Sequence, residues 1–491
     1  MSDRASFGAR LLPWLERESL PVTVFGLFVC GLIVRLPDQL RQDGWLALVS
    51  GRLVADSGLP STDTLTAWTA HVQWVDQQWL GQLFLYRLAS AGNLRLVMLV
   101  HVALLAGAMA AALVAARWRG GSARSVGLVA APALVVILMS AQMRAQSLAY
   151  PLFVAVAWLL IADERASSRR VLLVLPILVL WANVHGSVVL GALLTTLYGV
   201  SLVVRAVRHR AGALNGLLLR GALLAVAGCL CVFASPYGSS LFHYYGKTAF
   251  NSSFARVVSE WQHSWPSIMT LPFYVLAAAC AWFILRNRRV VSTFEQVALL
   301  LLFLSGVAAL RNMVWFSFFA LIVLPSPVAQ RLRDVGGKES KVVKTTLAAA
   351  AIAAVSVAGA GAAARSDSWL TSSVYPTAAA DAVAAAAATD PTARIYADVR
   401  YADWLLWTRP ELAGRIAYDA RFELLSSKEL EQLYHLENRL TPHWTAAVAD
   451  HRLVVLPRRQ GAPTAQAVMA EDGVRRIYRD RSVVVLLRPR S

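Results

Sequence analysis

The chain has 491 residues, of which 57% are hydrophobic and only 15% are charged. Soluble domains contain about 45–50% apolar and about 25% charged residues, so the mean hydropathy of +0.52 excludes an ordinary soluble enzyme and predicts a polytopic α-helical membrane protein. The net charge of +18 does not indicate nucleic-acid binding, because the basic residues cluster in the short loops on one side of the predicted spans.

Eleven apolar stretches are predicted to cross the membrane. The short basic segment 1–19 places the N-terminus in the cytoplasm. A first span at 20–37 leads to an outer loop at 38–95, and the other spans lie at 96–116, 126–140, 148–162, 171–184, 187–204, 221–235, 268–285, 296–310, 313–329 and 345–363. This order puts every arginine-rich short loop inside and the C-terminal part outside, as expected for a multi-pass protein of the cell (inner) membrane.

The outer loop 38–95 is too polar to cross a bilayer. Its stretches WLALVSGRLVADSG and QWLGQLFLYRLAS have helical apolar spacing and predict interfacial helices. The loop carries five aspartates with four tryptophans interleaved among them, in the order Asp38, Asp43, Trp45, Asp56, Asp63, Trp68, Trp74, Asp76 and Trp79. Carboxylates and indoles gathered at one membrane face indicate a site at the water–lipid boundary.

Composition divides the chain into a transmembrane domain at 1–363 and an extracytoplasmic domain at 364–491. The second part alternates short apolar stretches with helical segments, which predicts a small α/β domain. It contains no nucleophile–base pair, P-loop or metal spacing, so we interpret it as a lid or an acceptor-binding module. The four cysteines all lie in apolar segments and predict neither disulfides nor a metal site.

Several polar side chains fall at the outer ends of the predicted spans. Ionisable residues at membrane depth are costly, so such positions are functional hypotheses. They come from different spans, which predicts a shared cavity in the outer leaflet. The candidates are Asp43, Asp76, Arg144, Asn183, His185, Tyr237, Glu260, Trp261, Arg311 and Asn312.

Each candidate in the first loop has two interpretations. Asp43 begins an amphipathic run, where an acid can satisfy free N–H groups at a helix start; alternatively it is the general base that deprotonates an acceptor hydroxyl. Asp38 is the second candidate for that base. Asp63 suits a turn or a cap, and Asp76 could bind a sugar or a metal.

Two arginines lie on the outer side, against the inside bias of the basic residues. Arg144 and Arg311 are either snorkelling interfacial cations or clamps for a phosphate, whose oxygens match the guanidinium fork. Asn312 would assist Arg311. In WANVHGS, His185 and its neighbour Asn183 either pack at a turn between spans or line the site.

The second long outer loop contributes three candidates. Glu260 and Trp261 either orient a sugar, with the indole on a pyranose face and the carboxylate on hydroxyls, or anchor the loop at the interface. Tyr237 belongs to SPYG, a helix stop, and either faces the cavity or only ends the helix.

These segments together resemble the GT-C superfamily of lipid-linked-sugar glycosyltransferases, and most closely the bacterial family-39-like or dolichyl-phosphate-mannose-type mannosyltransferases. The likeness covers most of the chain in order, and it rests on DGWLALVSGRLVADSGLPSTDTL, WVDQQWL, WANVHGSVVLG, SPYG, SEW, LRNMVWFSF, DVRYADWLLW and YDARFE. It implies that Asp43, the matching first-loop acid, is catalytic. Many members pair two adjacent acids, whereas Gly44 follows Asp43 here, so a divalent cation stays open as a cofactor.

The resemblance also implies a polyprenyl-phosphate-linked sugar as donor and no nucleotide-sugar site. The acceptor would be a glycan, a lipid or a protein at the outer face. One rival is a transporter or flippase of lipid-linked sugars, which would need midplane polar residues and inverted repeats. Another is a non-catalytic envelope-assembly subunit whose C-terminal part recruits partners. Loss of Asp43 would inactivate the enzyme but not that subunit.

Overall fold

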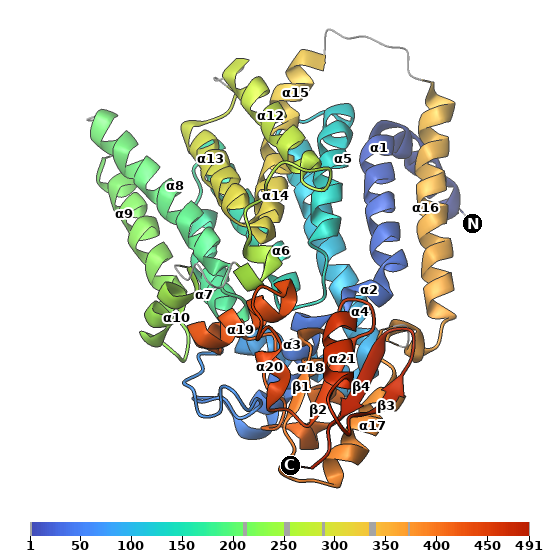
Figure 1. Ribbon diagram of the computed structural model, residues 1–491. Coiled ribbons are helices and arrows are strands. Elements are labelled where there is room, and N and C mark those ends of the chain that lie inside the picture. Colours follow the sequence, from blue (N-terminus) through green and yellow to red (C-terminus); the bar gives the residue numbers. More distant parts are fainter. Residues whose placement is uncertain are drawn as a thin grey trace.

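The computed structural model describes residues 2–209, 214–249, 256–286, 290–332, 340–371 and 374–490. The described chain is mostly helical, and its first part forms an assembly of helices that stand side by side in the upper part of Figure 1. These helices are α1 (Ser2–Val34), α4 (Trp79–Trp118), α5 (Ala123–Met139), α6 (Gln146–Arg165), α7 (Val174–Val184), α8 (Val188–His209), α9 (Leu214–Leu230), α12 (Leu271–Arg286), α13 (Thr293–Ala308), α14 (Met313–Val323), α15 (Pro325–Leu332) and α16 (Lys341–Ala363).

All eleven predicted spans fall on helices of the described chain. By length and composition, six helices in the described ranges can cross a membrane alone, and α14 with α15 would make a seventh across a bend of 44°. The helices α5, α12 and α13 have 17, 16 and 16 residues, fewer than the roughly 20 that a full crossing needs. The predicted polytopic helical fold is confirmed, while several predicted spans are short.

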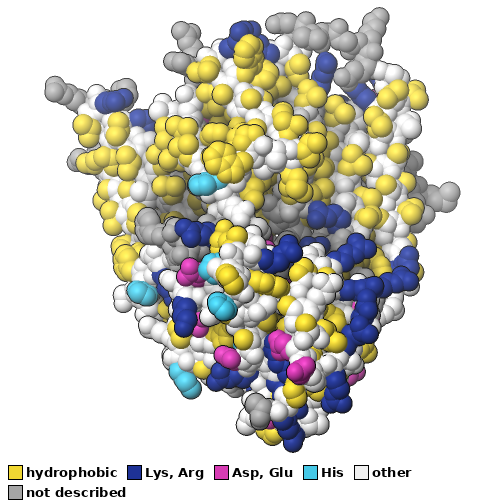
Figure 2. Space-filling view, viewed as in Figure 1, with side chains coloured by type: hydrophobic (Ala, Val, Ile, Leu, Met, Phe, Trp, Pro, Cys, Tyr) yellow, Lys and Arg dark blue, Asp and Glu magenta, His cyan; other side chains and the backbone are white. Residues whose placement is uncertain are grey.

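The outer surface of this helical assembly is apolar. Side chains such as Leu219, Val226 and Val357 are 72%, 61% and 73% exposed. On the face shown in Figure 2, hydrophobic side chains cover the region of the helices, and charged side chains gather mostly below them. Exposing so large an apolar surface to water is unfavourable, so this surface suits contact with lipid chains.

The predicted α/β region is confirmed by one four-stranded sheet in the order β1-β2-β4-β3. Strand β1 (Ile395–Ala397) pairs parallel with β2 (Leu453–Pro457), which pairs antiparallel with β4 (Val483–Leu487), and β4 pairs antiparallel with β3 (Arg475–Arg479). The helices of this region are α17 (Thr377–Ala388), α18 (Val399–Thr408), α19 (Ser427–Asn438), α20 (Ala446–Ala449) and α21 (Ala462–Met469). Strands β2 and β4 are buried along their whole length.

The outer loop and the C-terminal region share one hydrophobic core. The loop holds α2 (Leu36–Gln39) and α3 (Gln42–Ser57), and its second predicted helix is the start of α4. Residues from Gly44 to Gly51 are all buried, and Trp45 meets Tyr375 edge-on at 5.3 Å. An interfacial helix would keep one face on lipid, so that interpretation of α3 is wrong: it is a core helix.

Candidate active site

A cavity of about 660 Å³ opens where the outer loop, the adjoining helix ends and the C-terminal region meet. Its wall includes the start of α3, the turn between α5 and α6, the turn between α7 and α8, and the short 3-10 helices Ser259–Trp261 and Leu310–Asn312. Seven of the ten predicted site residues line it, namely Asp43, Arg144, His185, Glu260, Trp261, Arg311 and Asn312.

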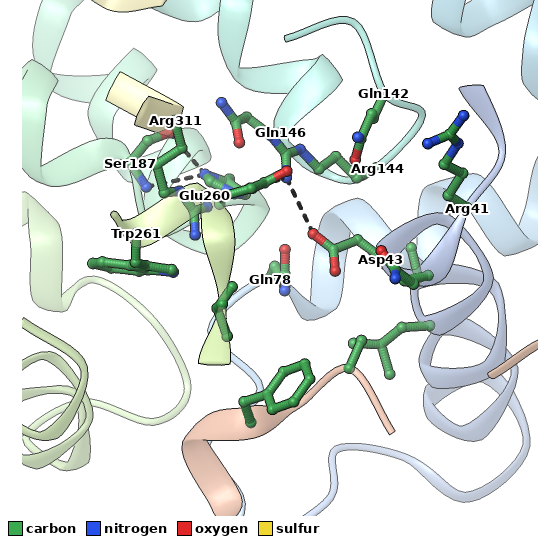
Figure 3. A pocket seen from close by; sticks show the side chains of 18 of the residues that line it. Arg41, Asp43, Gln78, Gln142, Arg144, Gln146, Ser187, Glu260, Trp261 and Arg311 are labelled. Carbon is green, nitrogen blue, oxygen red and sulfur yellow. Dashed lines mark hydrogen bonds and ion pairs between the residues drawn. The ribbon is translucent and has the colours of Figure 1, made fainter. Parts of the chain in front are cut away.

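Arg144 is the central cation of this cavity. Its Nη1 donates to Oδ2 of Asp43 at 3.2 Å and to Oε2 of Glu260 at 2.6 Å. Asp43 and Glu260 belong to different segments, and both point toward Arg144 (Figure 3). The Arg144 side chain is only 5% exposed, so its charge acts in a medium that screens it poorly.

Local packing places Asp43 beside Arg144. The N–H of Met143 donates to the carbonyl of Gln39 at 2.9 Å, which ties the α5–α6 turn to the start of the outer loop. A Cβ on Gly44 would lie 2.7 Å from the Met143 carbonyl oxygen, a distance that only a glycine avoids. The glycine after Asp43 therefore has a packing reason: it lets the two segments approach closely enough for the ion pair.

The electrostatics separate the two acids. Burial raises the pKa of the Asp43 carboxyl above its usual 3.8, and although Arg144 opposes this shift, the charge of Glu260 adds to it. The Asp43 side chain is 45% exposed, but it faces the cavity rather than open solvent. Burial would also raise the pKa of Glu260, yet Arg144 and Arg311 outweigh it and lower that pKa. Glu260 thus stays a carboxylate, whereas Asp43 takes up a proton more readily than a solvated aspartate does.

Arg311 provides the second cation of the cavity. Its guanidinium lies 4.9 Å from the centre of the Trp261 ring, a cation–π contact that holds it in place. Asn312 lines the cavity beside it and donates to the Ser305 carbonyl at 3.4 Å. The predicted pair of outer arginines therefore lines one cavity together with Asp43.

His185 is neutral and its proton can be assigned. Burial lowers the pKa of the imidazole well below 6.5, and Arg311 and Arg144 lower it further. Its Nδ1 accepts the backbone N–H of Ser187 at 3.1 Å, so the proton sits on Nε2. A neutral imidazole in this tautomer can donate one hydrogen bond to a ligand.

Three predicted site residues are not among those that line the cavity, and the polar groups of two of them make hydrogen bonds elsewhere. Asn183 accepts from Trp79 Nε1 at 3.0 Å and donates to the carbonyls of Val179 and Ala234 at 2.9 and 2.8 Å. The Tyr237 hydroxyl donates to the Pro60 carbonyl at 2.9 Å. The pocket role predicted for both is corrected to a structural one.

Asp76 is the third of these residues. Its side chain is 2% exposed, and burial raises the pKa of its carboxyl to about 7. It is not among the residues that line the cavity, so its contact with a sugar stays a prediction.

Other residues of the cavity wall had no assigned role in the sequence. They include several glutamines, two further arginines and parts of the C-terminal region, namely Gln42, Gln77, Gln78, Gln82, Gln142, Gln146, Arg41, Tyr244, Tyr245, Tyr375, Arg400, Phe422 and Glu423. Gln77 and Gln78 lie in WVDQQWL, and Phe422 and Glu423 lie in YDARFE. Both segments carry the family resemblance, so the sequence already marked these stretches as possible parts of the site. Amide groups that both donate and accept suit the binding of hydroxyls.

In the ranges that the structure describes, no three His, Cys, Asp or Glu side chains are grouped so that they could hold a metal ion. Within the described residues, the cavity wall carries four arginines, Arg41, Arg144, Arg311 and Arg400, whose guanidinium groups could receive an anionic group. They can neutralise a phosphate directly.

No protein-family model matches the chain, and no curated protein matches its sequence. Among solved structures, the crystal structure of ArnT from Cupriavidus metallidurans bound to undecaprenyl phosphate matches with a TM-score of 0.52 at 14% identity, over 94% of this chain and 97% of that chain. The apo state of the same ArnT matches with a TM-score of 0.49 at 14% identity, over 94% and 97% of the two chains.

The apo oligosaccharyltransferase of Archaeoglobus fulgidus matches with a TM-score of 0.48 at 12% identity, over 91% of this chain and 71% of that chain. The two apo likenesses are weaker and support no conclusion. The likeness to lipid-bound ArnT extends over nearly the whole chain, so the chain shares the overall fold of that structure.

Proposed function

We propose that this protein is an integral-membrane glycosyltransferase that moves a sugar from a polyprenyl-phosphate-linked donor to an acceptor at the extracytoplasmic face. The observation that supports this proposal most directly is that Asp43, Glu260, Arg144 and Arg311 line one cavity of about 660 Å³. The fold neighbour ArnT binds undecaprenyl phosphate, and a lipid donor of this class would bring its phosphate to such a cluster. The arginine-rich short loops favour a cytoplasmic N-terminus and an outer C-terminal region in the cell (inner) membrane.

In this proposal the arginines hold the phosphate of the donor. Arg144 lines the cavity, and its Nε is a donor that makes no hydrogen bond within the described residues. As the bond between the anomeric carbon and the phosphate oxygen breaks, its electron pair stays on the phosphate, and Arg144 and Arg311 stabilise that growing charge. His185 Nε2 and Glu260 would hold the sugar on the same side.

Asp43 takes the proton. The acceptor hydroxyl forms the new bond to the anomeric carbon while its proton moves to the Asp43 carboxylate, so charge and atoms balance. The raised pKa of Asp43 makes it a stronger base than a solvated aspartate, which suits proton abstraction near neutral pH.

Replacing Asp43 tests the proposal. D43N should lower sugar transfer by about a hundredfold to ten-thousandfold, the contribution of a general base, while binding of undecaprenyl phosphate stays near the wild-type level. The matched control is D56N, because Asp56 is an exposed aspartate of the same helix. Near-normal transfer by D43N, or equal losses in D43N and D56N, would remove Asp43 from the base role.

A further inference from the structure

The C-terminal region forms a wall of the cavity. The residues that it contributes include Tyr375, Arg400, Phe422 and Glu423. Arg144 and Arg311, which also line the cavity, come from the transmembrane part of the chain. The region is thus part of the site itself, and a separate recruiting function would not require these contacts.

An ion-pair network fixes this wall. Arg421 donates to Oδ1 of Asp63 at 2.7 Å and to Oδ2 of Asp419 at 2.6 Å, and it stacks on the Trp74 ring at 4.3 Å. All three charged side chains are at most 3% exposed. The network locks the C-terminal segment onto the outer loop, and the next two residues, Phe422 and Glu423, are thereby held at the cavity.

Glu423 has no role in the steps given above. In the described part of the chain no basic side chain forms a salt bridge with it, since the adjacent Arg421 is engaged by Asp63 and Asp419. Burial raises the pKa of its carboxyl to about 7; the charge of Arg421 opposes this shift, and the charges of Asp419 and Asp43 add to it. A carboxyl near its midpoint at neutral pH can both accept and donate a hydrogen bond.

We propose that this wall is the acceptor subsite and that Glu423 binds a hydroxyl of a carbohydrate acceptor; the inference rests on the proposed function. In the proposed function the donor phosphate binds Arg144 and Arg311, whereas the C-terminal wall carries Glu423 together with a single cation, Arg400, in the described residues. Asp43 pairs with Arg144 and lines the same cavity as Glu423. The residue that takes the acceptor proton therefore shares one cavity with the donor-side arginines and with the C-terminal wall.

The chemistry of the wall selects the kind of acceptor. Phe422 and Tyr375 supply aromatic faces, which pack against the apolar faces of sugar rings. A carboxyl group and glutamine amides beside them match hydroxyls, which also donate and accept. A wholly apolar acceptor would leave Glu423 desolvated and unpaired, at a cost in binding free energy.

The test measures the two subsites separately on the full-length protein in nanodiscs. The donor probe is undecaprenyl phosphate, and the acceptor probes are neutral methyl hexosides and the corresponding disaccharides, followed by saturation-transfer NMR. E423A should weaken glycoside binding by about tenfold to a hundredfold, as for a lost hydrogen bond to an ionisable group. E423Q should retain part of the affinity because its amide still binds a hydroxyl, and both variants should bind undecaprenyl phosphate normally.

Glu431 offers a matched control, since it is an exposed acid of α19 in the same region, and E431Q should change neither affinity. The inference is overturned if the wild type binds none of the glycosides, if E423A binds them as well as the wild type, or if E423A loses both ligands together with thermal stability. Failure of the wild type to bind undecaprenyl phosphate would instead contradict the proposed function. In that case, weaker glycoside binding by the Glu423 variants alone would still support a carbohydrate subsite at Glu423.

Discussion

A single nitrogen of Arg144 lies 3.2 Å from the Asp43 carboxylate, although the two residues are 101 positions apart in sequence. The same Nη1 is closer to Glu260, at 2.6 Å. Two acids thus share one buried cation, and the nearer one takes more of its stabilisation. Burial raises the pKa of Asp43 more than Arg144 lowers it, whereas Arg144 and Arg311 together outweigh burial at Glu260 and lower its pKa.

Removing the charge of Glu260 should therefore change the pH dependence of transfer. The base is active when deprotonated, so activity rises with pH through the pKa of Asp43. In E260Q the charge that raises this pKa is gone and Arg144 pairs with Asp43 alone, so the pKa falls and the acid limb of kcat/KM moves to lower pH. A pH–rate profile of E260Q beside E431Q measures the shift. An unmoved limb, or one at higher pH, would show that Glu260 does not act on Asp43.

The two arginines should differ in their effect on donor binding. R144A leaves Asp43 and Glu260 without their shared cation, so it removes the attraction for phosphate and adds repulsion, and R311A removes attraction alone. We expect R311A to weaken undecaprenyl phosphate binding by about tenfold to a hundredfold, the worth of hydrogen bonds to a charged group, and R144A to weaken it more.

R144K should rescue little, because an ammonium cannot reproduce the guanidinium fork. Isothermal titration in nanodiscs gives the affinities, and R459A, which changes an exposed arginine far along the chain, serves as the control. Wild-type affinity in R144A would show that the phosphate binds elsewhere.

The convergence of these charges was predictable from the sequence, because topology alone places the ends of successive spans on one side of the membrane. Asp43, Arg144, Glu260 and Arg311 were each singled out in this way, and all line the cavity. Topology does not give the direction of a side chain. Asn183 and His185 are two residues apart, yet Asn183 turns back onto the Val179 and Ala234 carbonyls while His185 lines the cavity.

The contribution of the C-terminal region was not predictable in the same way. It depends on the contact between Asp63 and Arg421, which are 358 residues apart, and no local pattern specifies so distant a pairing. The division at 363 and 364 follows composition, whereas Trp45 of the outer loop packs on Tyr375 of the C-terminal region. The hydropathy boundary therefore differs from the boundary of the packed core.

The glycine after Asp43 should be as important as its charge. In G44A the new Cβ would meet the Met143 carbonyl oxygen at 2.7 Å, so the turn that carries Arg144 must move away from Asp43. A displacement near 1 Å can lower turnover by about a hundredfold, and we expect a loss of that order in kcat with helix content unchanged. The control is G107A, since a Cβ on Gly107 of α4 meets open space. Equal activity of G44A and the wild type would show that the turn adapts without cost.

Breaking the network around Arg421 should destabilise the contact between the outer loop and the C-terminal region. R421M leaves Asp63 and Asp419 buried without a cation, which costs about 3–5 kcal/mol for a buried pair and should lower the Tm in detergent. The triple variant D63N/D419N/R421M should recover part of this loss, because removing every charge also removes the desolvation penalty.

The loss in R421M should also depend on pH. Burial raises the pKa of Asp63 in the folded protein, but the charge of Arg421 and the hydrogen bonds from Thr66 and Thr69 outweigh burial, so that this pKa is lowered. A lowered folded pKa contributes stability that is full above the unfolded value, near 3.9, and is lost as the pH falls through the folded pKa. In R421M the unpaired carboxyls take up protons on acidification and cease to be buried charges. The difference in Tm between R421M and the wild type should therefore be greatest near neutral pH and shrink in acid, and a difference that is constant with pH would mean that packing on Trp74, rather than charge, holds the two parts together.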